Sequence, residues 1–153
     1  MRINEAYQEM KIYHQTIQSN AASVCKEVAL VLDQLKSTFS IDEDDRFEVK
    51  VILSELLQNA IRHGNKMDEN KKIILDVSMN GGDLLQISVL DEGLGFDVND
   101  TLAQKKQKAY LTDDIFEMEE FGRGLMIIET LCDHVYRNEL GNQITVKKQM
   151  HLS

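Results

Sequence analysis

Two apolar segments joined by a tight turn constrain the fold of this chain more than any other feature. The segments are Lys71–Met79 and Leu84–Leu90, and the residues between them read Asn80-Gly81-Gly82-Asp83. Asparagine and glycine tolerate the positive φ angles that a short hairpin turn requires. The two segments are therefore predicted to be neighbouring antiparallel strands.

Two amphipathic helices are predicted ahead of this hairpin. The first begins after a cap at Ser19 or Asn20 and ends near Phe39. Its apolar side chains recur at helical spacing and form a stripe that faces the core: Val24, Val28, Val31, Leu32 and Leu35.

The second helix is predicted from about Glu43 to His63. Ser40-Ile41-Asp42 supplies a break and a fresh cap, and Ile41 can pack back onto the helix. Gly64-Asn65 would end the helix with a left-handed residue. Five apolar residues are expected on its inner face: Phe47, Val51, Ile52, Leu56 and Ala60.

Further strands are predicted near both ends of the chain. Tyr7–Ile17 carries β-forming residues and suggests an edge strand. Val135–Glu139 and Gln143–Met150 flank a turn at Gly141-Asn142 and are expected to form a closing hairpin.

Between the two hairpins, apolar periodicity fades from Val98 to Phe121. This predicts a long, mobile loop with room for one short helix, and a loop of that length in a compact domain is usually either functional or disordered. Phe121–Leu125 then opens a third helix that ends near Asp133. The order of elements favours an α+β fold, a two-layer α/β sandwich with helices on one face of a mixed, mostly antiparallel sheet.

Bulk composition narrows the class of protein. The 153 residues suit a single domain, and the net charge of −9 repels nucleic acid and anionic lipid, so neither is expected as a partner. Cys25 and Cys132 lie far apart in apolar surroundings, which indicates reduced thiols and a cytoplasmic setting. No segment is long and apolar enough to span a bilayer.

The second predicted helix carries a polar pair that could perform chemistry. Glu55 and Asn59 are four residues apart, so their side chains lie one above the other. A carboxylate and a carboxamide at the edge of an apolar helix face suggest a base beside a metal ligand. The alternative is a surface hydrogen bond on an ordinary amphipathic helix.

A second polar group follows the return strand, where the chain reads Asp91-Glu92-Gly93-Leu94-Gly95. Asp91 could point into a pocket and accept a hydrogen bond from an adenine amino group. Gly93 and Gly95 would let the backbone approach a flat base. The alternative is a tight acidic turn.

The third predicted helix opens with Gly122-Arg123-Gly124. The free N–H groups and positive dipole end of a helix N-terminus suit phosphate oxygens, and Arg123 could add a charge-assisted contact. A flexible loop before a capped helix is the alternative, because a lone Gly-x-Gly is a weak motif.

In this order, the three motifs resemble the nucleotide-binding domain of the GHKL ATPase superfamily, the histidine-kinase-like ATPases, over nearly the whole chain. The resemblance is strongest to the small, free-standing anti-sigma factor serine/threonine kinases of bacteria. The three sequence boxes of that family match Glu55–Gly64, Leu90–Asp97, and Gly122–Ile128 followed by Leu131–Asp133.

The resemblance implies ATP and Mg²⁺ as ligands of one domain that covers residues 1–153. Asn59 would bind Mg²⁺, Glu55 would be the general base, and Asp91 would read the adenine amino group. The boxes imply further nucleotide-binding residues: His63, Gly93, Gly95, Phe96, Gly122, Arg123, Gly124 and Leu125.

The resemblance also implies that residues 98–121 form an ATP lid. Lys105, Lys106 and Lys108 could reach the phosphates when this lid closes, or could form a solvated loop face. His63 lies in a nucleotide box and is not interpreted as a phosphoacceptor. Gly64 follows it where many serine kinases of the family carry Ala.

The implied function is transfer of the γ-phosphate to a Ser or Thr of a STAS-type antagonist protein, which regulates an alternative sigma factor in bacterial signalling. An ATP-responsive binding switch without phosphoryl transfer, or the catalytic domain of a histidine kinase-like protein, are the alternatives. Members of the family often form homodimers, and the edge at Tyr7–Ile17 could pair across such a contact.

Overall fold

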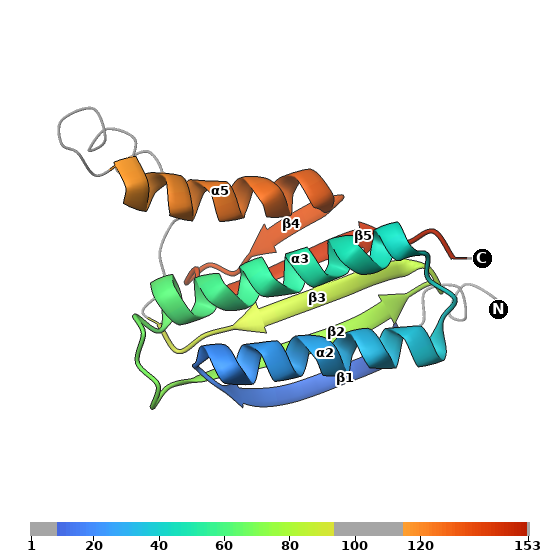
Figure 1. The fold of residues 1–153 in the computed structure, drawn as a ribbon, viewed down its shortest axis with the longest axis horizontal. Coiled ribbons are helices and arrows are strands. Elements are labelled where there is room, and N and C mark those ends of the chain that lie inside the picture. The colour runs from blue at the N-terminus through green and yellow to red at the C-terminus, as the bar shows by residue number, and fades with distance from the viewer. Residues whose placement is uncertain (1–8, 94–114, 153) are drawn as a thin grey trace.

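The computed structural model describes residues 9–93 and 115–152, and the segment 115–122 by its backbone alone. Three helices lie on one face of a five-stranded sheet (Figure 1). In chain order the elements are β1 Glu9–Gln18, α2 Ala21–Thr38, α3 Glu43–Asn59, the π-helical turn η1 Ala60–Gly64, β2 Lys72–Asn80, β3 Leu84–Leu90, α5 Ile115–Leu131, β4 His134–Arg137 and β5 Gln143–Gln149.

The strand order in the sheet is β1-β2-β3-β5-β4. All pairings between these described strands are antiparallel. The predicted two-layer α+β class is therefore confirmed, with the described strands forming an antiparallel rather than a mixed sheet. β1 lies at one edge, as predicted, and the closing hairpin of β4 and β5 forms the other side.

The central hairpin forms at the turn where it was predicted. Gly81 and Gly82 have φ angles of 62° and 93°, which explains why glycine occupies both positions. Asn80 pairs with Leu84 across the turn, and the register continues to Ile74 opposite Leu90.

Local capping sets where the first two helices begin. The Asn20 side chain accepts a hydrogen bond of 2.8 Å from the Ser23 amide at the start of α2. Asp42 caps α3 in the same way by accepting from the Asp45 amide at 2.7 Å. Both predicted caps are confirmed.

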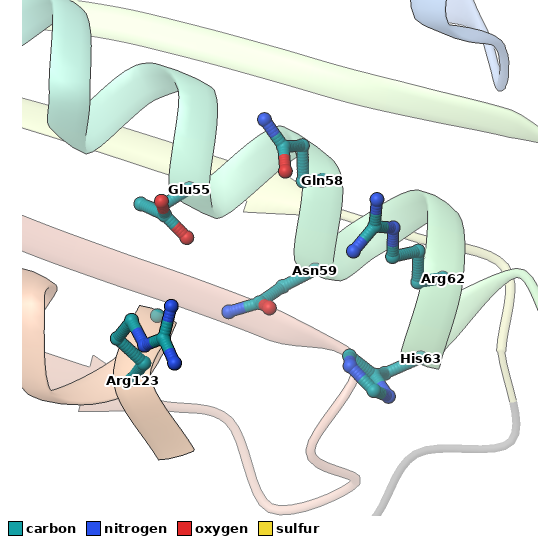
Figure 2. Close-up of a pocket in the computed structure, with 7 residues that line it drawn as sticks. Glu55, Gln58, Asn59, Arg62, His63 and Arg123 are labelled. Atoms are coloured by element: carbon teal, nitrogen blue, oxygen red, sulfur yellow. The ribbon is translucent and has the colours of Figure 1, made fainter. Parts of the chain in front are cut away.

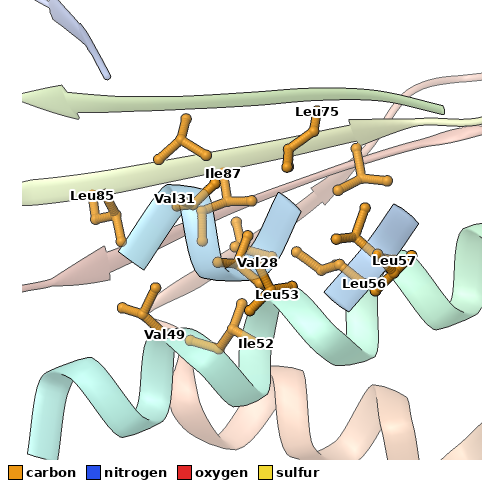
Figure 3. Close-up of a cluster of buried hydrophobic side chains, with 14 of the residues drawn as sticks. Val28, Val31, Val49, Ile52, Leu53, Leu56, Leu57, Leu75, Leu85 and Ile87 are labelled. Atoms are coloured by element: carbon orange, nitrogen blue, oxygen red, sulfur yellow. The ribbon is translucent and has the colours of Figure 1, made fainter. Parts of the chain in front are cut away.

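The core lies between the helices and the inner face of the sheet (Figure 3). The predicted stripe of α2 is buried along its whole length. Alternate residues of β2 and β3 meet it, since side chains of a strand point to opposite faces. Among the residues that are almost fully buried are Leu35, Ile52, Leu53, Leu56, Leu57, Leu75, Leu85 and Ile87.

The inner face of α3 differs in part from the prediction. Ile52, Leu56 and Ala60 are buried as expected, but Phe47 is 66% exposed and Val51 is only half-buried. Phe47 lies about 140° around the helix from Ile52, so both cannot face the same core. The prediction for Phe47 was wrong because apolar character alone did not identify the buried side.

The second helix also ends differently from the prediction. Gly64 belongs to the π-helical turn η1, in which the Asn65 amide donates to the Ala60 carbonyl at 2.7 Å. The left-handed residues come later, at Lys66 and Met67, with φ angles of 54° and 63°. Gly64 is therefore not needed for a left-handed helix end.

α5 begins at Ile115, well ahead of Gly122. The prediction that the third helix opens at Phe121 was wrong, and residues 115–121, assigned to the loop and lid, continue the helix. The rest of the predicted lid, residues 98–114, lies outside the described residues. No helix in the described parts of the chain is long and apolar enough to cross a membrane.

Candidate functional site

A polar pocket lies between the C-terminal half of α3 and α5. Seven residues line it: Glu55, Gln58, Asn59, Arg62, His63, Arg123 and Gly124. Figure 2 shows Glu55 and Asn59 on successive turns of α3, with Arg123 reaching toward them from α5. The i, i+4 spacing predicted from the sequence therefore aims both side chains into the same space.

α5 approaches this pair closely because residue 124 is glycine. A Cβ atom at Gly124 would lie 2.8 Å from Glu55 Oε2 and 3.6 Å from Asn59 Oδ1. The first of these distances is shorter than a normal contact, so a larger residue at position 124 would displace the Glu55 carboxylate or the helix. The missing side chain keeps the space over Glu55 and Asn59 open.

Asn59 has hydrogen-bonding capacity that the protein itself does not use. Its Nδ2 atom is buried and has no hydrogen-bond partner among the described residues. A buried polar group without a partner costs free energy of about 1–3 kcal/mol, which a bound ligand can recover. This is the feature expected of a residue that faces a ligand.

A second, more apolar pocket adjoins the first. It is lined by Leu56, Asn59, Ala60, Val89, Asp91, Leu125, Gly141 and Ile144. Asn59 lines both pockets, so they meet at this residue. A ligand with a flat apolar end and an anionic end could lie across the two.

Asp91 is the carboxylate of the apolar pocket, and it follows β3 directly. Burial raises its pKa, while a hydrogen bond from the Gly93 amide and the charge of Lys71 act in the opposite direction. Its Oδ1 atom accepts from Gly93 N at 2.8 Å, and its own amide donates to the Asn142 carbonyl at 2.9 Å. Asp91 can thus offer an oxygen acceptor in apolar surroundings.

Two glycines pack tightly around this carboxylate. A Cβ atom at Gly64 would lie 2.1 Å from Asp91 Oδ2, and one at Gly93 would lie 2.3 Å from the Gly64 carbonyl oxygen. Neither distance is possible for real atoms. Gly93 is required for the close approach of η1 to the chain after β3, because its Cβ atom would meet backbone, whereas a Cβ atom at Gly64 would displace the Asp91 carboxylate.

The polar pocket concentrates positive charge on an acidic protein. Arg62 and Arg123 line it in a chain whose net charge is −9. The described residues contain no group of three or more His, Cys, Asp or Glu side chains that could hold a metal ion. A Mg²⁺ ion here would therefore take Asn59 as a ligand and complete its shell with phosphate and water oxygens, a usual arrangement for this ion.

Most of the predicted site residues come together in these pockets. Glu55, Asn59, His63, Arg123 and Gly124 line the polar pocket, and Asp91 and Leu125 line the apolar one with Asn59. Gly93 lies beside Asp91. Gly95, Phe96 and the three lid lysines lie outside the described residues.

Gly122 lies inside α5 rather than at its start. The Gly122-Arg123-Gly124 segment therefore offers no free N–H groups of a helix N-terminus, and that prediction was wrong. α5 instead contributes Arg123 through its side chain and Gly124 through its lack of one.

The residues that were not predicted for the site are Gln58 and Arg62 on the first pocket, and Leu56, Ala60, Val89, Gly141 and Ile144 on the second. Helical spacing could have found the first two, because each is three residues beyond Glu55 or Asn59. Gly141 and Ile144 carried no such signal. They reach the pocket because β5 pairs with β3, and the paired residues are separated by more than fifty positions in the sequence.

The chain is similar to known proteins over most of its length. A family model described as the histidine kinase-like ATPase domain matches residues 17–148. A protein named serine-protein kinase RsbW from Bacillus licheniformis is 32% identical over 130 residues, which cover 82% of this chain and 77% of the relative.

Two proteins named anti-sigma F factor are similar to it as well. The one from Geobacillus thermodenitrificans is 29% identical over 146 residues, 95% of this chain and 93% of the relative. The one from Priestia megaterium is 27% identical over 127 residues, 83% of this chain and 80% of the relative. This family match covers the three helices, both pockets and the described strands apart from most of β1 and the last residue of β5, so the chain belongs to the histidine kinase-like ATPase domain family.

Proposed function

We propose that this protein is an anti-sigma factor serine/threonine kinase that transfers the γ-phosphate of ATP to a Ser or Thr of a STAS-type antagonist protein. The observation that carries the proposal is that Asn59 lines both pockets, so one nucleotide can lie with its base at Asp91 and its phosphates beside Glu55. The names of the relatives, serine-protein kinase and anti-sigma factor, support the same activity.

The apolar pocket suits adenine. Val89, Leu125 and Ile144 offer apolar surface to the ring, and the Asp91 carboxylate accepts a hydrogen bond from the amino group. A base that presents a carbonyl oxygen at that position would face the carboxylate with two acceptors opposed. Asp91 therefore selects adenine over guanine.

The polar pocket suits the phosphates. Arg62 and Arg123 supply positive charge. Asn59 would hold Mg²⁺ through its Oδ1 atom, and its unpartnered Nδ2 atom can donate a hydrogen bond to a phosphate oxygen. Mg²⁺, when bound with the phosphates, neutralises part of their charge. His63 closes the same pocket as a neighbour of the nucleotide.

Glu55 acts as the general base. Its half-buried carboxylate faces the polar pocket one helical turn from Asn59, where it can accept the proton of an attacking Ser or Thr hydroxyl. Gly124 leaves the space that the hydroxyl needs. The proton moves to Glu55 as the oxygen attacks the γ-phosphorus in line with the departing ADP.

The partners follow from the same proposal. The protein binds an alternative sigma factor and the STAS-type antagonist, acts in the cytoplasm, and can dimerise through the edge strand β1. The experiment is to incubate the full chain with γ-labelled ATP, Mg²⁺ and purified candidate STAS proteins, and to test capture of candidate sigma factors in parallel.

We expect label on one Ser or Thr of a STAS partner, and loss of that label when the acceptor residue is changed to Ala. Tight ATP binding without label on any partner would contradict the kinase and favour a nucleotide-responsive binding switch.

A further inference from the structure

Asn65 is a buried polar residue to which the proposed mechanism gives no role. It follows the π-helical turn η1 directly and is fully buried, with 0% of its surface exposed. Its Nδ2 atom donates to the Lys72 carbonyl at 3.1 Å, and its Oδ1 atom accepts from the Glu92 amide at 2.8 Å. One side chain thus joins the end of the active-site helix to the start of β2 and to the residue after Asp91.

These contacts close into a ring of three residues. Asn65 donates to Lys72, the Lys72 amide donates to the Glu92 carboxylate, and the Glu92 amide donates back to Asn65. Each member lies on a different segment of the chain. The ring therefore ties the segment after β3 to η1 at a point next to Asp91.

The backbone on both sides of Asn65 is constrained. Lys66 and Met67 both have positive φ angles, which cost free energy in residues other than glycine and persist only where neighbouring contacts enforce them. Gly64 and Gly93 touch on the other side, within a distance that admits no side chain. Asn65 lies between these two features.

We infer that Asn65 is a positioning residue for nucleotide recognition, which holds the Asp91 carboxylate against Gly64 so that it faces the base. Glu92 assists by closing the ring through its carboxylate. The inference rests on the proposed function, in which Asp91 accepts the adenine amino group.

The test compares Asn65→Ala with Asn70→Ala, a matched change at an exposed asparagine of the same loop. Calorimetry measures the affinity for ATP and for purine riboside triphosphate, which lacks the amino group that Asp91 accepts. Asn65→Ala should weaken ATP binding by about tenfold, the cost of a misplaced buried acceptor. It should leave the affinity for the analogue unchanged within about twofold, and Asn70→Ala should change neither.

A double-mutant cycle makes the dependence on Asp91 explicit. In an Asp91→Asn background, Asn65→Ala should cause no further loss of ATP affinity, because the contact through which Asn65 acts is already removed. Equal losses for ATP and the analogue, or losses that add in the double variant, would overturn the inference.

A second readout needs no nucleotide. The pKa of Asp91, raised by burial, can be followed by carbon-detected NMR of its carboxyl group. Asn65→Ala should lower this pKa toward the ordinary value as water reaches the freed carboxylate. An unchanged pKa overturns the positioning role even if the protein binds no ATP, which separates this inference from the proposed function.

If Asn65→Ala does not fold, Glu92→Ala replaces it, since Glu92 is exposed and removing its carboxylate opens the ring at one bond. We expect the same selective loss, reduced to about threefold because an exposed hydrogen bond contributes less. Unchanged ATP affinity in Glu92→Ala would contradict a role of the ring in positioning Asp91.

Discussion

The two ends of the candidate nucleotide site are built in different ways. At the Asp91 end, backbone segments from η1, β3 and the turn before β5 pack so closely that a Cβ atom at Gly93 would meet the Gly64 backbone and one at Gly64 would meet the Asp91 carboxylate. At the Glu55 end, the lining consists mostly of side chains, several of them exposed, from α3, η1 and α5.

This difference indicates that base recognition and phosphoryl transfer depend on different ends of the site. A close-packed backbone cannot adjust, so the Asp91 end is suited to recognise one flat group in one orientation. Side chains on a helix surface can rotate, so the Glu55 end is suited to follow phosphates and an acceptor through a reaction. Substitutions at the two ends should therefore affect binding and transfer separately.

The largest effect is expected from Glu55→Gln. The amide cannot accept the proton of the acceptor hydroxyl, so phosphoryl transfer should fall by about 100- to 10,000-fold. ATP affinity should stay within about twofold, because the substitution preserves shape. Transfer is measured with γ-labelled ATP and a STAS partner, and Glu69→Gln at an exposed acid serves as control. Parallel loss of ATP affinity would contradict the separation of the two ends.

Gly64→Ala should have the next largest effect, at the other end of the site. The new methyl group would lie 2.1 Å from Asp91 Oδ2, so the carboxylate or η1 must move. The carboxylate must shift in the same way as in the serine kinases of the family that carry Ala at this position. Overpacking of this kind costs about 1–3 kcal/mol, which corresponds to a loss of roughly 5- to 150-fold in ATP affinity.

Gly82→Ala is the matched control for that substitution. Nothing lies within 4 Å of its Cβ position, but its φ of +93° disfavours a side chain. It should lower the thermal midpoint and leave ATP affinity unchanged. Wild-type affinity in Gly64→Ala would show that the Asp91 end adjusts after all.

Asp91→Asn should weaken ATP binding by about 1–3 kcal/mol, because the amide can present a donor where the adenine amino group needs an acceptor. Since burial raises the pKa of Asp91, wild-type affinity should begin to fall at a higher pH than an ordinary Asp would require. Calorimetry from neutral pH down to about pH 4 tests this, and Asp91→Asn should remove that part of the pH dependence.

Asp91→Asn should stabilise the protein at neutral pH, although it weakens ATP binding. A raised carboxyl pKa in the folded state means that the Asp91 contribution to stability is fully present below its unfolded pKa and is lost as pH rises through the folded pKa. At neutral pH the buried carboxylate is therefore unfavourable, and Asp91→Asn should raise the thermal midpoint while it weakens ATP binding. A lower midpoint at neutral pH would contradict the burial of Asp91.

Features coded by neighbouring residues could be predicted from the sequence. The glycine turn at residues 81–82, the cap at Asp42 and the stripe of α2 depend on short-range chemistry, and all are confirmed. The order of the three motifs was enough to identify the family. The exposure of Phe47 was open to the same local reasoning, because helical spacing places Phe47 about 140° from Ile52 and away from the buried side.

Features that depend on distant segments could not be predicted. Asn65 and Glu92 are separated by 27 positions, so nothing local indicated their hydrogen bond. The same holds for Gly64, whose requirement for glycine comes from Asp91 rather than from a helix end. The early start of α5 escaped prediction because two glycines normally favour a helix boundary.

The smallest effect is expected from Arg62→Ala, at the exposed rim of the polar pocket. If Arg62 contacts only phosphates, its removal should weaken ATP binding by about 1 kcal/mol, since water screens an exposed charge. Adenosine, which lacks phosphates, should bind the wild type and Arg62→Ala equally. Arg62→Lys should recover part of the lost ATP affinity, because it restores the positive charge without the planar guanidinium group. An equal loss for adenosine would mean that Arg62 acts on the base pocket through η1, and the two ends would then not be independent.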